Sequence, residues 1–358
     1  MSHAAPTTRR RLRERPVVAF LTALVLIAAT FTGLSVGPFT SIASATDGDM
    51  TLTVTTTFVA QQVEMPIAGT VTGTVTIDWG DSSSSSVTTD GNVPHVYGSP
   101  GTYTVSIAGS FTHFGSCGFG SLVGVETFTA VTAWGNNGTN DFSCAFFNAT
   151  SLVSVPAALP TTTPIVTTSA MFYGASSFNS NIGGWDTSSI VDMSYMFNGA
   201  ASFNQDISGW NTSNVTDMSV MFADAISFNR SLQSWNTANV INMYRMFAAA
   251  SAFNQNLGNW NIANVLTMDG MLDGSGLSKS NYSNTLIGWA TLPPPSNIVL
   301  GADGLVYDQT AVAARATLTS TYTWTISGDT FSPSPGPSTS TTSSSPDPGD
   351  VVIPQFAG

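Results

Sequence analysis

Few residues in this chain could carry out acid–base or nucleophilic chemistry. Of its three histidines, only His95 and His113 lie beyond the first 45 residues. A catalytic triad or a metal site needs histidine close to serine, cysteine or carboxylates, and the sequence suggests no such cluster. We therefore predict no catalytic residue, no cofactor and no metal site, and we expect a protein that is not an enzyme.

Carboxylates leave one enzymatic alternative open, a parallel β-helix that acts on polysaccharide. In such a protein, acidic side chains on one exposed face act as acid and base. The available carboxylates are Asp186, Asp192, Asp206, Asp217 and Asp224. Asp192 and Asp217 recur with the period of the repeat described below, beside expected helix starts. Helix capping is therefore the preferred interpretation of this pair.

The composition narrows the range of partners. The 358 residues include nine basic side chains against 21 acidic ones, and the formal net charge is −12. Five of the nine basic residues lie between Arg9 and Arg15. A surface so poor in Lys and Arg cannot neutralise phosphates, which argues against DNA, RNA and anionic lipid as partners and excludes nucleic acid.

The first 45 residues have the order of a cleaved secretory signal peptide. An arginine cluster comes first, an apolar stretch runs from Val17 to about Leu34, and Ala43-Ser44-Ala45 precedes Thr46. The alternative is an uncleaved membrane anchor, but the apolar run is shorter than the ~20 residues of a spanning helix. We expect the mature chain to be secreted or held at the cell surface, with no transmembrane segment.

Residues 46–112 predict a small all-β sandwich. Their Thr, Val and Ser residues alternate with period two; Val75, Ile77 and Trp79, for example, are separated by polar residues. Three short motifs follow one another here: Trp79-Gly80-Asp81, His95-Val96-Tyr97 and Gly101-Thr102-Tyr103-Thr104-Val105. This order resembles the PKD-type immunoglobulin-like domain, which implies a spacer or adhesion module. Asp78 and Asp81 offer too few oxygens for calcium, so we interpret them as turn residues.

An internal repeat with a constant period extends from Met171 to Leu272. One period is the distance in sequence from Trp185 to Trp210. A period of this size indicates a solenoid, propeller or other array. The repeated columns are Trp185, Trp210, Trp235 and Trp260; Met196, Met221 and Met246; Phe197, Phe222 and Phe247; Met193, Met218, Met243 and Met268; and Phe178, Phe203, Phe228 and Phe253. Because equivalent residues stack in a solenoid, we assign these columns to the core and give them no role in chemistry.

Each repeat predicts one short helix and one extended rung. In the second unit, Val215, Met218, Met221-Phe222 and Ala225 follow at steps of three or four residues, the spacing of one helix face. Asn214 precedes them as a candidate cap. The predicted fold class is therefore an α/β repeat solenoid of the leucine-rich-repeat type, preceded by the small all-β domain.

The repeat resembles that of BspA-like leucine-rich-repeat bacterial surface proteins. The resemblance rests on the run from Ser202 to Met218 and on the following Met221-Phe222. It implies surface display and adhesion, with an extracellular protein or glycan as partner, and we expect a monomer. A purely structural envelope spacer is the other alternative. Tyr195, Val220 and Tyr244 are taken as one equivalent position in three coils, between the core columns. Their exposure as an apolar and aromatic patch would favour a binding protein over a spacer.

The segments around the repeats predict two caps and a linker. Residues 113–170 are interpreted as a degenerate first coil, because Phe146-Phe147 lie one period before Met171-Phe172. Residues 171–275 hold the good repeats. One period past Trp260 there is no tryptophan, so residues 276–330 are predicted to be a C-terminal cap. Residues 331–358 are rich in Pro, Ser and Thr and are predicted to be a linker.

The two cysteines are candidates for one disulfide. Cys117 and Cys144 form an even pair in a chain that we expect to be exported, and their separation is close to one coil. Two buried free thiols are the alternative.

Overall fold

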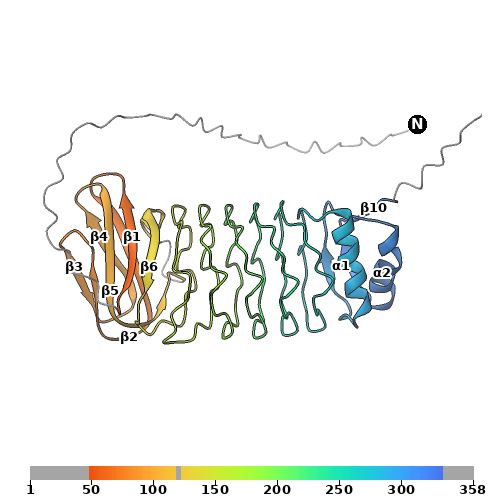
Figure 1. Ribbon diagram of the computed structural model, residues 1–358, viewed down its shortest axis with the longest axis horizontal. Helices are drawn as coiled ribbons and strands as arrows, with labels where there is room; N and C mark the ends of the chain where they lie inside the picture. Colours follow the sequence, from red (N-terminus) through yellow and green to blue (C-terminus); the bar gives the residue numbers. More distant parts are fainter. Residues whose placement is uncertain (1–47, 118–121, 334–358) are drawn as a thin grey trace, which may run out of the picture. The chain divides into compact units, whose positions relative to one another are not determined.

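The computed structural model describes residues 48–117 and 122–333 (Figure 1). The predicted signal peptide, residues 1–45, and nearly all of the predicted linker, 331–358, lie outside the described residues. All of the structure described below belongs to one compact unit, Ala43–Gly358.

The first part of this unit is an antiparallel sheet of six strands. The strands are β1 (Met50–Thr56), β2 (Gln61–Asp78), β3 (Ser84–Val87), β4 (Gly91–Tyr97), β5 (Gly101–Phe114) and β6 (Phe128–Trp134). Their order is β3-β2-β5-β1-β6, and β4 also pairs with β2. The period-two pattern places alternate residues such as Leu52, Val54 and Ile77 in the core. The expected N-terminal β domain is present, and β6 extends it to Trp134 because β6 pairs with β1.

The coils after β6 contain none of the short helices predicted from the repeat. Between Trp134 and Lys279 the backbone forms successive turns. In the coil that contains Val220, Met221 and Ala223 donate backbone hydrogen bonds to the residue three positions earlier, while Val220 and Phe222 donate to the next coil. A helix would keep all of these bonds within the segment. The inward side chains simply share the three-and-four spacing of a helix face.

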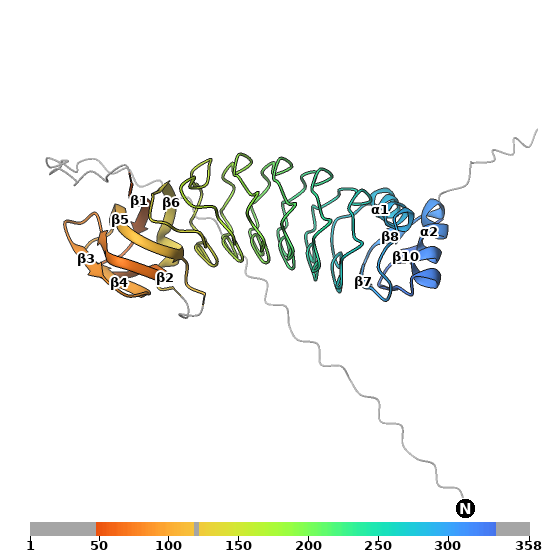
Figure 2. The ribbon, with the colours of Figure 1, turned by 90° about the horizontal axis from the view of Figure 1, so that it is seen from below.

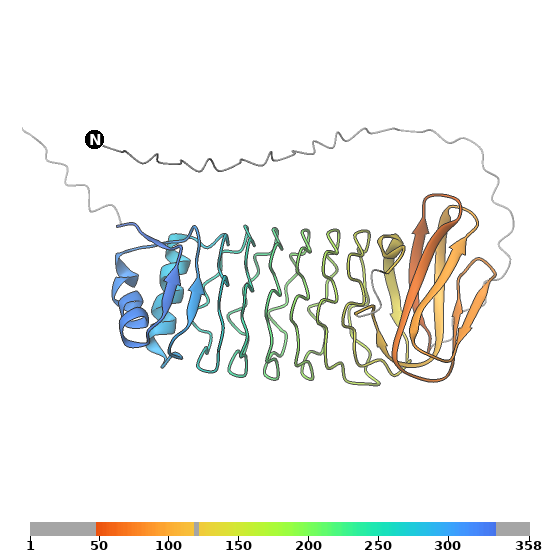
Figure 3. The same cartoon turned by 180° about the vertical axis from the view of Figure 1, so that it is seen from behind.

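The coils stack in parallel, as Figures 1 and 3 show in green. Single parallel bridges join each coil to the next at Asp141, Thr167, Asp192, Asp217, Asn242 and Thr267. The interval between bridged residues is constant from Thr167 onward, but the first step, from Asp141 to Thr167, is one residue longer. Phe146 therefore stacks on Phe172, with ring centroids 5.9 Å apart. The predicted alignment of Phe146 with Met171 is wrong by one residue, because the first coil has one residue more.

The repeated columns form the core of the stack. The rings of Trp185 and Trp210 are 6.3 Å apart and nearly parallel, at 6°. The phenylalanine columns stack in the same way, and the methionine side chains of the repeat are buried. All residues of the Trp185 to Trp260, Met196 to Met246 and Phe197 to Phe247 columns are buried. Each coil thus buries its apolar side against its two neighbours.

The C-terminal segment continues the stack with a longer coil. It contains α1 (Lys279–Thr291), β7 (Val299–Gly301), β8 (Val306–Tyr307), α2 (Val312–Ala316), β9 (Thr325–Ser327) and β10 (Thr330–Phe331), and α1 contacts α2 (Figure 2). The Trp289 indole donates to the Leu257 carbonyl at 3.0 Å, as Trp260 donates to Leu232 at 2.9 Å. The tryptophan column therefore continues past Trp260. It was missed because the coil that carries α1 is four residues longer.

The sheet and the first coil are joined by a disulfide and by polar contacts. Cys117 follows β5 and is bonded to Cys144 of the first coil, with Cα atoms 5.5 Å apart. His113 Nε2 lies 2.9 Å from the Ser143 carbonyl oxygen. Within the described residues, no helix has the length and apolar character needed to cross a membrane.

Candidate binding face of the coils

The outward side of one segment in each coil carries the candidate site. We define the outer face as the outward side chains of residues 166–174, 191–199, 216–224, 241–249 and 266–274. These segments follow one another in the stack, because alternate backbone N–H groups of each donate to carbonyls of the next. The inward side chains of the same segments belong to the methionine and phenylalanine columns.

An apolar column runs along the start of these segments. Val166, Val191, Ile241 and Leu266 are 40%, 44%, 44% and 75% exposed. Thr216 occupies the same position in the coil between Val191 and Ile241. The backbone N–H of each donates to the carbonyl of its equivalent one coil earlier, for example Leu266 to Ile241 at 2.8 Å. Equivalent residues of the column therefore follow one another from coil to coil, and its apolar members face solvent on either side of Thr216.

A second apolar group lies further along the same segments. Val220, Ala223 and Ala248 form a small buried cluster that is separate from the main core. Tyr195 and Tyr244 are 40% and 39% exposed. The sequence predicts one equivalent position for Tyr195, Val220 and Tyr244, and the structure shows that this prediction is wrong.

The correction concerns both register and burial. Tyr195 and Val220 occupy equivalent positions, but the third equivalent is Arg245, and Tyr244 lies one residue before it. Val220 is only 7% exposed. Exposed aromatic side chains at this face are therefore confined to some of the coils.

Carboxylates lie directly beside the apolar column. Asp192 Oδ1 and Asp217 Oδ1 accept the backbone N–H of the residue two positions later, at 2.8 and 2.7 Å. Asn242 donates its side-chain amide to Asp217 Oδ2 at 2.9 Å. These side chains stabilise turns, so their predicted role as helix caps is wrong. Likewise, the candidate cap Asn214 donates to the Ser188 carbonyl, at 2.7 Å.

Two further carboxylates considered for chemistry also form turns. Hydrogen bonds from Ser188 lower the pKa of Asp186, and those from Ser208 lower the pKa of Asp206. A general acid in a polysaccharide-active enzyme needs a raised pKa, so these shifts have the opposite sign. Asp224, the last of the five, is exposed on the outer face. Among the described residues, no group of three or more His, Cys, Asp and Glu is placed to hold a metal ion.

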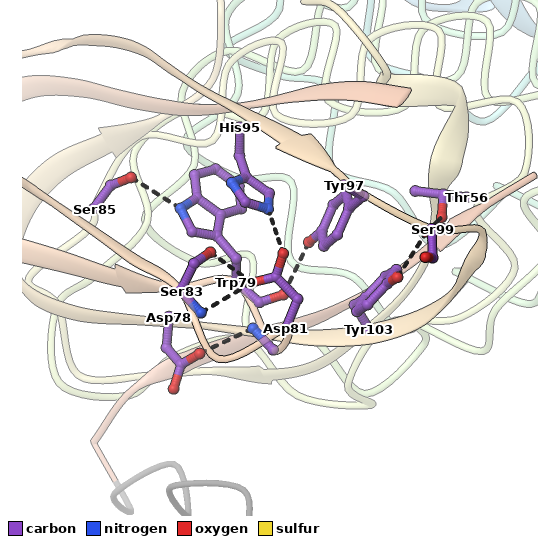
Figure 4. A network of polar contacts seen from close by, with 11 residues as sticks. Thr56, Asp78, Trp79, Asp81, Ser83, Ser85, His95, Tyr97, Ser99 and Tyr103 are labelled. Carbon is purple, nitrogen blue, oxygen red and sulfur yellow. Dashed lines mark hydrogen bonds and ion pairs between the residues drawn. The ribbon is translucent and has the colours of Figure 1, made fainter. Parts of the chain in front are cut away.

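The sheet holds a separate polar network around Trp79 (Figure 4). His95 Nε2 lies 2.9 Å from Asp81 Oδ2, and the His95 ring stacks on Trp79 at 4.5 Å. Burial alone would raise the pKa of Asp81, but hydrogen bonds from Ser83 and His95 outweigh it and lower the pKa. Asp78 Oδ1 accepts the Gly80 N–H at 2.9 Å. Both aspartates therefore hold the turn.

The serine run after Asp81 completes this network. Ser83 donates to Asp81, and Ser85 Oγ accepts the Trp79 indole N–H at 2.9 Å. The Tyr97 hydroxyl donates to the Trp79 carbonyl at 3.0 Å, and burial raises the pKa of Tyr97. Since these side chains satisfy one another, we interpret the network as structural.

Sequence reasoning missed the exposed apolar column. Its signal was present as pairs of adjacent apolar residues, such as Ile190-Val191 and Val265-Leu266. Only the first residue of each pair is buried. The predicted helix did not show this difference, because it did not specify whether the second residue of each pair faces the core or the solvent.

One protein family matches the repeat region. Residues 140–245 and 166–285 each match the model described as Mycoplasma protein of unknown function, DUF285. The matched range covers the stacked coils and part of α1. No curated protein and no solved structure matches the chain significantly.

Proposed function

We propose that the chain is a non-enzymatic binding protein, secreted or displayed at a bacterial cell surface, whose outer face contacts an extracellular protein or glycan. The observation that carries the proposal is the column of exposed Val, Ile and Leu side chains along the coils, in which Thr216 is the one polar member. Exposed apolar surface of this kind, repeated at one position, is typical of interaction sites.

Comparison with the other exposed columns favours binding over a spacer role. The exposed column of Asn211, Asn236 and Asn261 is polar throughout. The amides of this column accept backbone N–H groups within their own turns, for example Ala238 N–H to Asn236 at 3.0 Å. A spacer needs only such polar columns around its core. Leu266, 75% exposed, contributes little to that core and is better explained by a partner.

Three further observations support the extracytoplasmic location and the family resemblance. The first 45 residues have the order of a signal peptide, and a disulfide suits an oxidising compartment. The coils match a family of unknown function. We keep the BspA-like and PKD-like resemblances as part of this proposal, and with them the adhesive role and the monomeric state.

The test uses threonine, which the chain itself places in this column at Thr216. The exported chain and its V191T/I241T/L266T variant would be screened against immobilised extracellular-matrix proteins and glycans. We expect at least one component to bind, and the variant to bind it about tenfold more weakly, because it loses apolar area. The control is A238S/A263S, since Ser213 occupies the equivalent position. The proposal fails if nothing binds or if both variants bind like the parent.

A further inference from the structure

We propose that the partner of the outer face is a protein segment on which Lys or Arg is flanked by aliphatic or aromatic side chains. This inference rests on the proposed function and names the chemistry of the partner. It is carried by the charges that lie between the two apolar groups of the face.

The outer face is strongly acidic. Its five segments hold a single basic residue, Arg245, against five carboxylates: Asp192, Asp217, Asp224, Asp269 and Asp273. Asp192 and Asp217 are bridge partners on adjacent coils. Bridged backbones lie about 4.8 Å apart, so the two negative charges repel each other. A cation placed between them would remove this repulsion.

The carboxylates retain free capacity to bind such a cation. Asp192 Oδ1 accepts one backbone N–H, and among the described residues no donor reaches Asp192 Oδ2. Within the described part of the chain, the Asn242 amide is the one donor that reaches Asp217 Oδ2. Both side chains are partly exposed. The unused lone pairs suit the donors of a lysine or arginine side chain.

Apolar and aromatic side chains lie on both sides of Asp192. Val191 immediately precedes Asp192, and Tyr195 follows three residues later; both are exposed. Tyrosine faces attract cations, and the aliphatic column can bury the apolar neighbours of a lysine or arginine. The face therefore complements a basic and apolar segment better than a purely basic one.

Charge also argues against the other occupants. A second copy of this chain would bring another acidic face, since the net charge is −12. Neutral glycans would leave the carboxylates unpaired, and acidic glycans would be repelled. A cationic protein segment satisfies both the charge and the apolar surface.

The experiment compares two double variants that change the net charge equally. D192N/D217N removes two negative charges from the outer face, and D186N/D206N removes two from exposed turns outside it. Asparagine already occupies the equivalent positions in other coils of this chain. Asn242 is equivalent to Asp192 and Asp217, Asn211 to Asp186, and Asn181 to Asp206. Each of these asparagines accepts the same turn hydrogen bond, which keeps the fold intact.

The probes are three synthetic peptides in which Lys, Gln or Glu alternates with Leu and Tyr. We expect the exported chain to bind the Lys peptide most tightly, with weaker binding at high salt. D192N/D217N should weaken that binding about fivefold, and D186N/D206N less than twofold. V191T/I241T/L266T should weaken it as well.

The outcomes separate this inference from the proposed function. If the Gln peptide binds as tightly as the Lys peptide and only the threonine variant weakens binding, the face binds a partner but the cationic inference is overturned. Equal loss in both Asp-to-Asn variants, or no binding of the Lys peptide, also overturns it. If the Lys peptide does not bind, the screen with matrix proteins and glycans still tests the proposed function.

Discussion

At the scale of single residues, the tryptophan indoles connect coils that are adjacent in the stack. Trp235 Nε1 donates to the buried Ile207 carbonyl at 3.1 Å. Trp235→Phe would remove this donor and leave a void, so we expect unfolding free energy to fall by about 2 kcal/mol. Urea denaturation would measure it. Met243→Leu, a nearly volume-conserving change, should cost about 1 kcal/mol or less. Equal losses in the two variants would contradict this role of the indole.

The Asp81 carboxylate predicts an acid dependence of the sheet. Its pKa is lowered from the ordinary value of 3.8, because hydrogen bonds from Ser83 and His95 outweigh the effect of burial. The ionised form thus stabilises the fold above pH 3.8, and this contribution is lost as pH falls through the lower folded pKa. We expect Asp81→Asn to reduce the stability difference between pH 5 and pH 3, measured by urea denaturation. Asp90→Asn, on an exposed loop, should leave that difference as in the parent.

At the scale of elements, one glycine distinguishes the observed turns from the predicted helix. Gly199 has φ of 68°, and an added Cβ would make only ordinary contact with Gly174. Gly199→Ala should therefore destabilise the protein by about 1 kcal/mol through the backbone alone. In a helix the same change would stabilise by about 1 kcal/mol. Gly209→Ala, where φ is not left-handed, is the control and should be neutral or slightly stabilising in thermal unfolding.

The spacing of side chains predicted the core of the elements but not their backbone. Met218, Met221 and Phe222 point inward as expected, because helix and consecutive turns place residues three and four apart on one side. The pattern could not show that alternate N–H groups bond to the next coil. Nor could it show which residue of Val265-Leu266 faces solvent. Consequently the core columns were predictable from the sequence, and the outer face was not.

At the scale of the whole molecule, the described coils hold together through their neighbours. The same contacts recur at each step: Thr187, Thr212 and Thr237 each donate to a carbonyl of the next coil, at 3.0, 3.0 and 2.9 Å. In such a stack, stability is close to a sum of coil and interface contributions. The longer coil with α1 keeps the tryptophan contact, so the stack also tolerates an insertion between the contacts.

This additivity predicts that one whole coil can be removed. Deletion of residues 211–235 places Asn236 where Asn211 stood, so Thr187 regains a carbonyl acceptor and Trp260 takes the place of Trp235. We expect a folded protein with cooperative urea unfolding at a lower midpoint. Deletion of 211–222, about half a coil, leaves a coil too short for its columns to reach their partners and should give a protease-sensitive chain. If limited proteolysis finds both deletions equally resistant, the columns do not set the register of the stack.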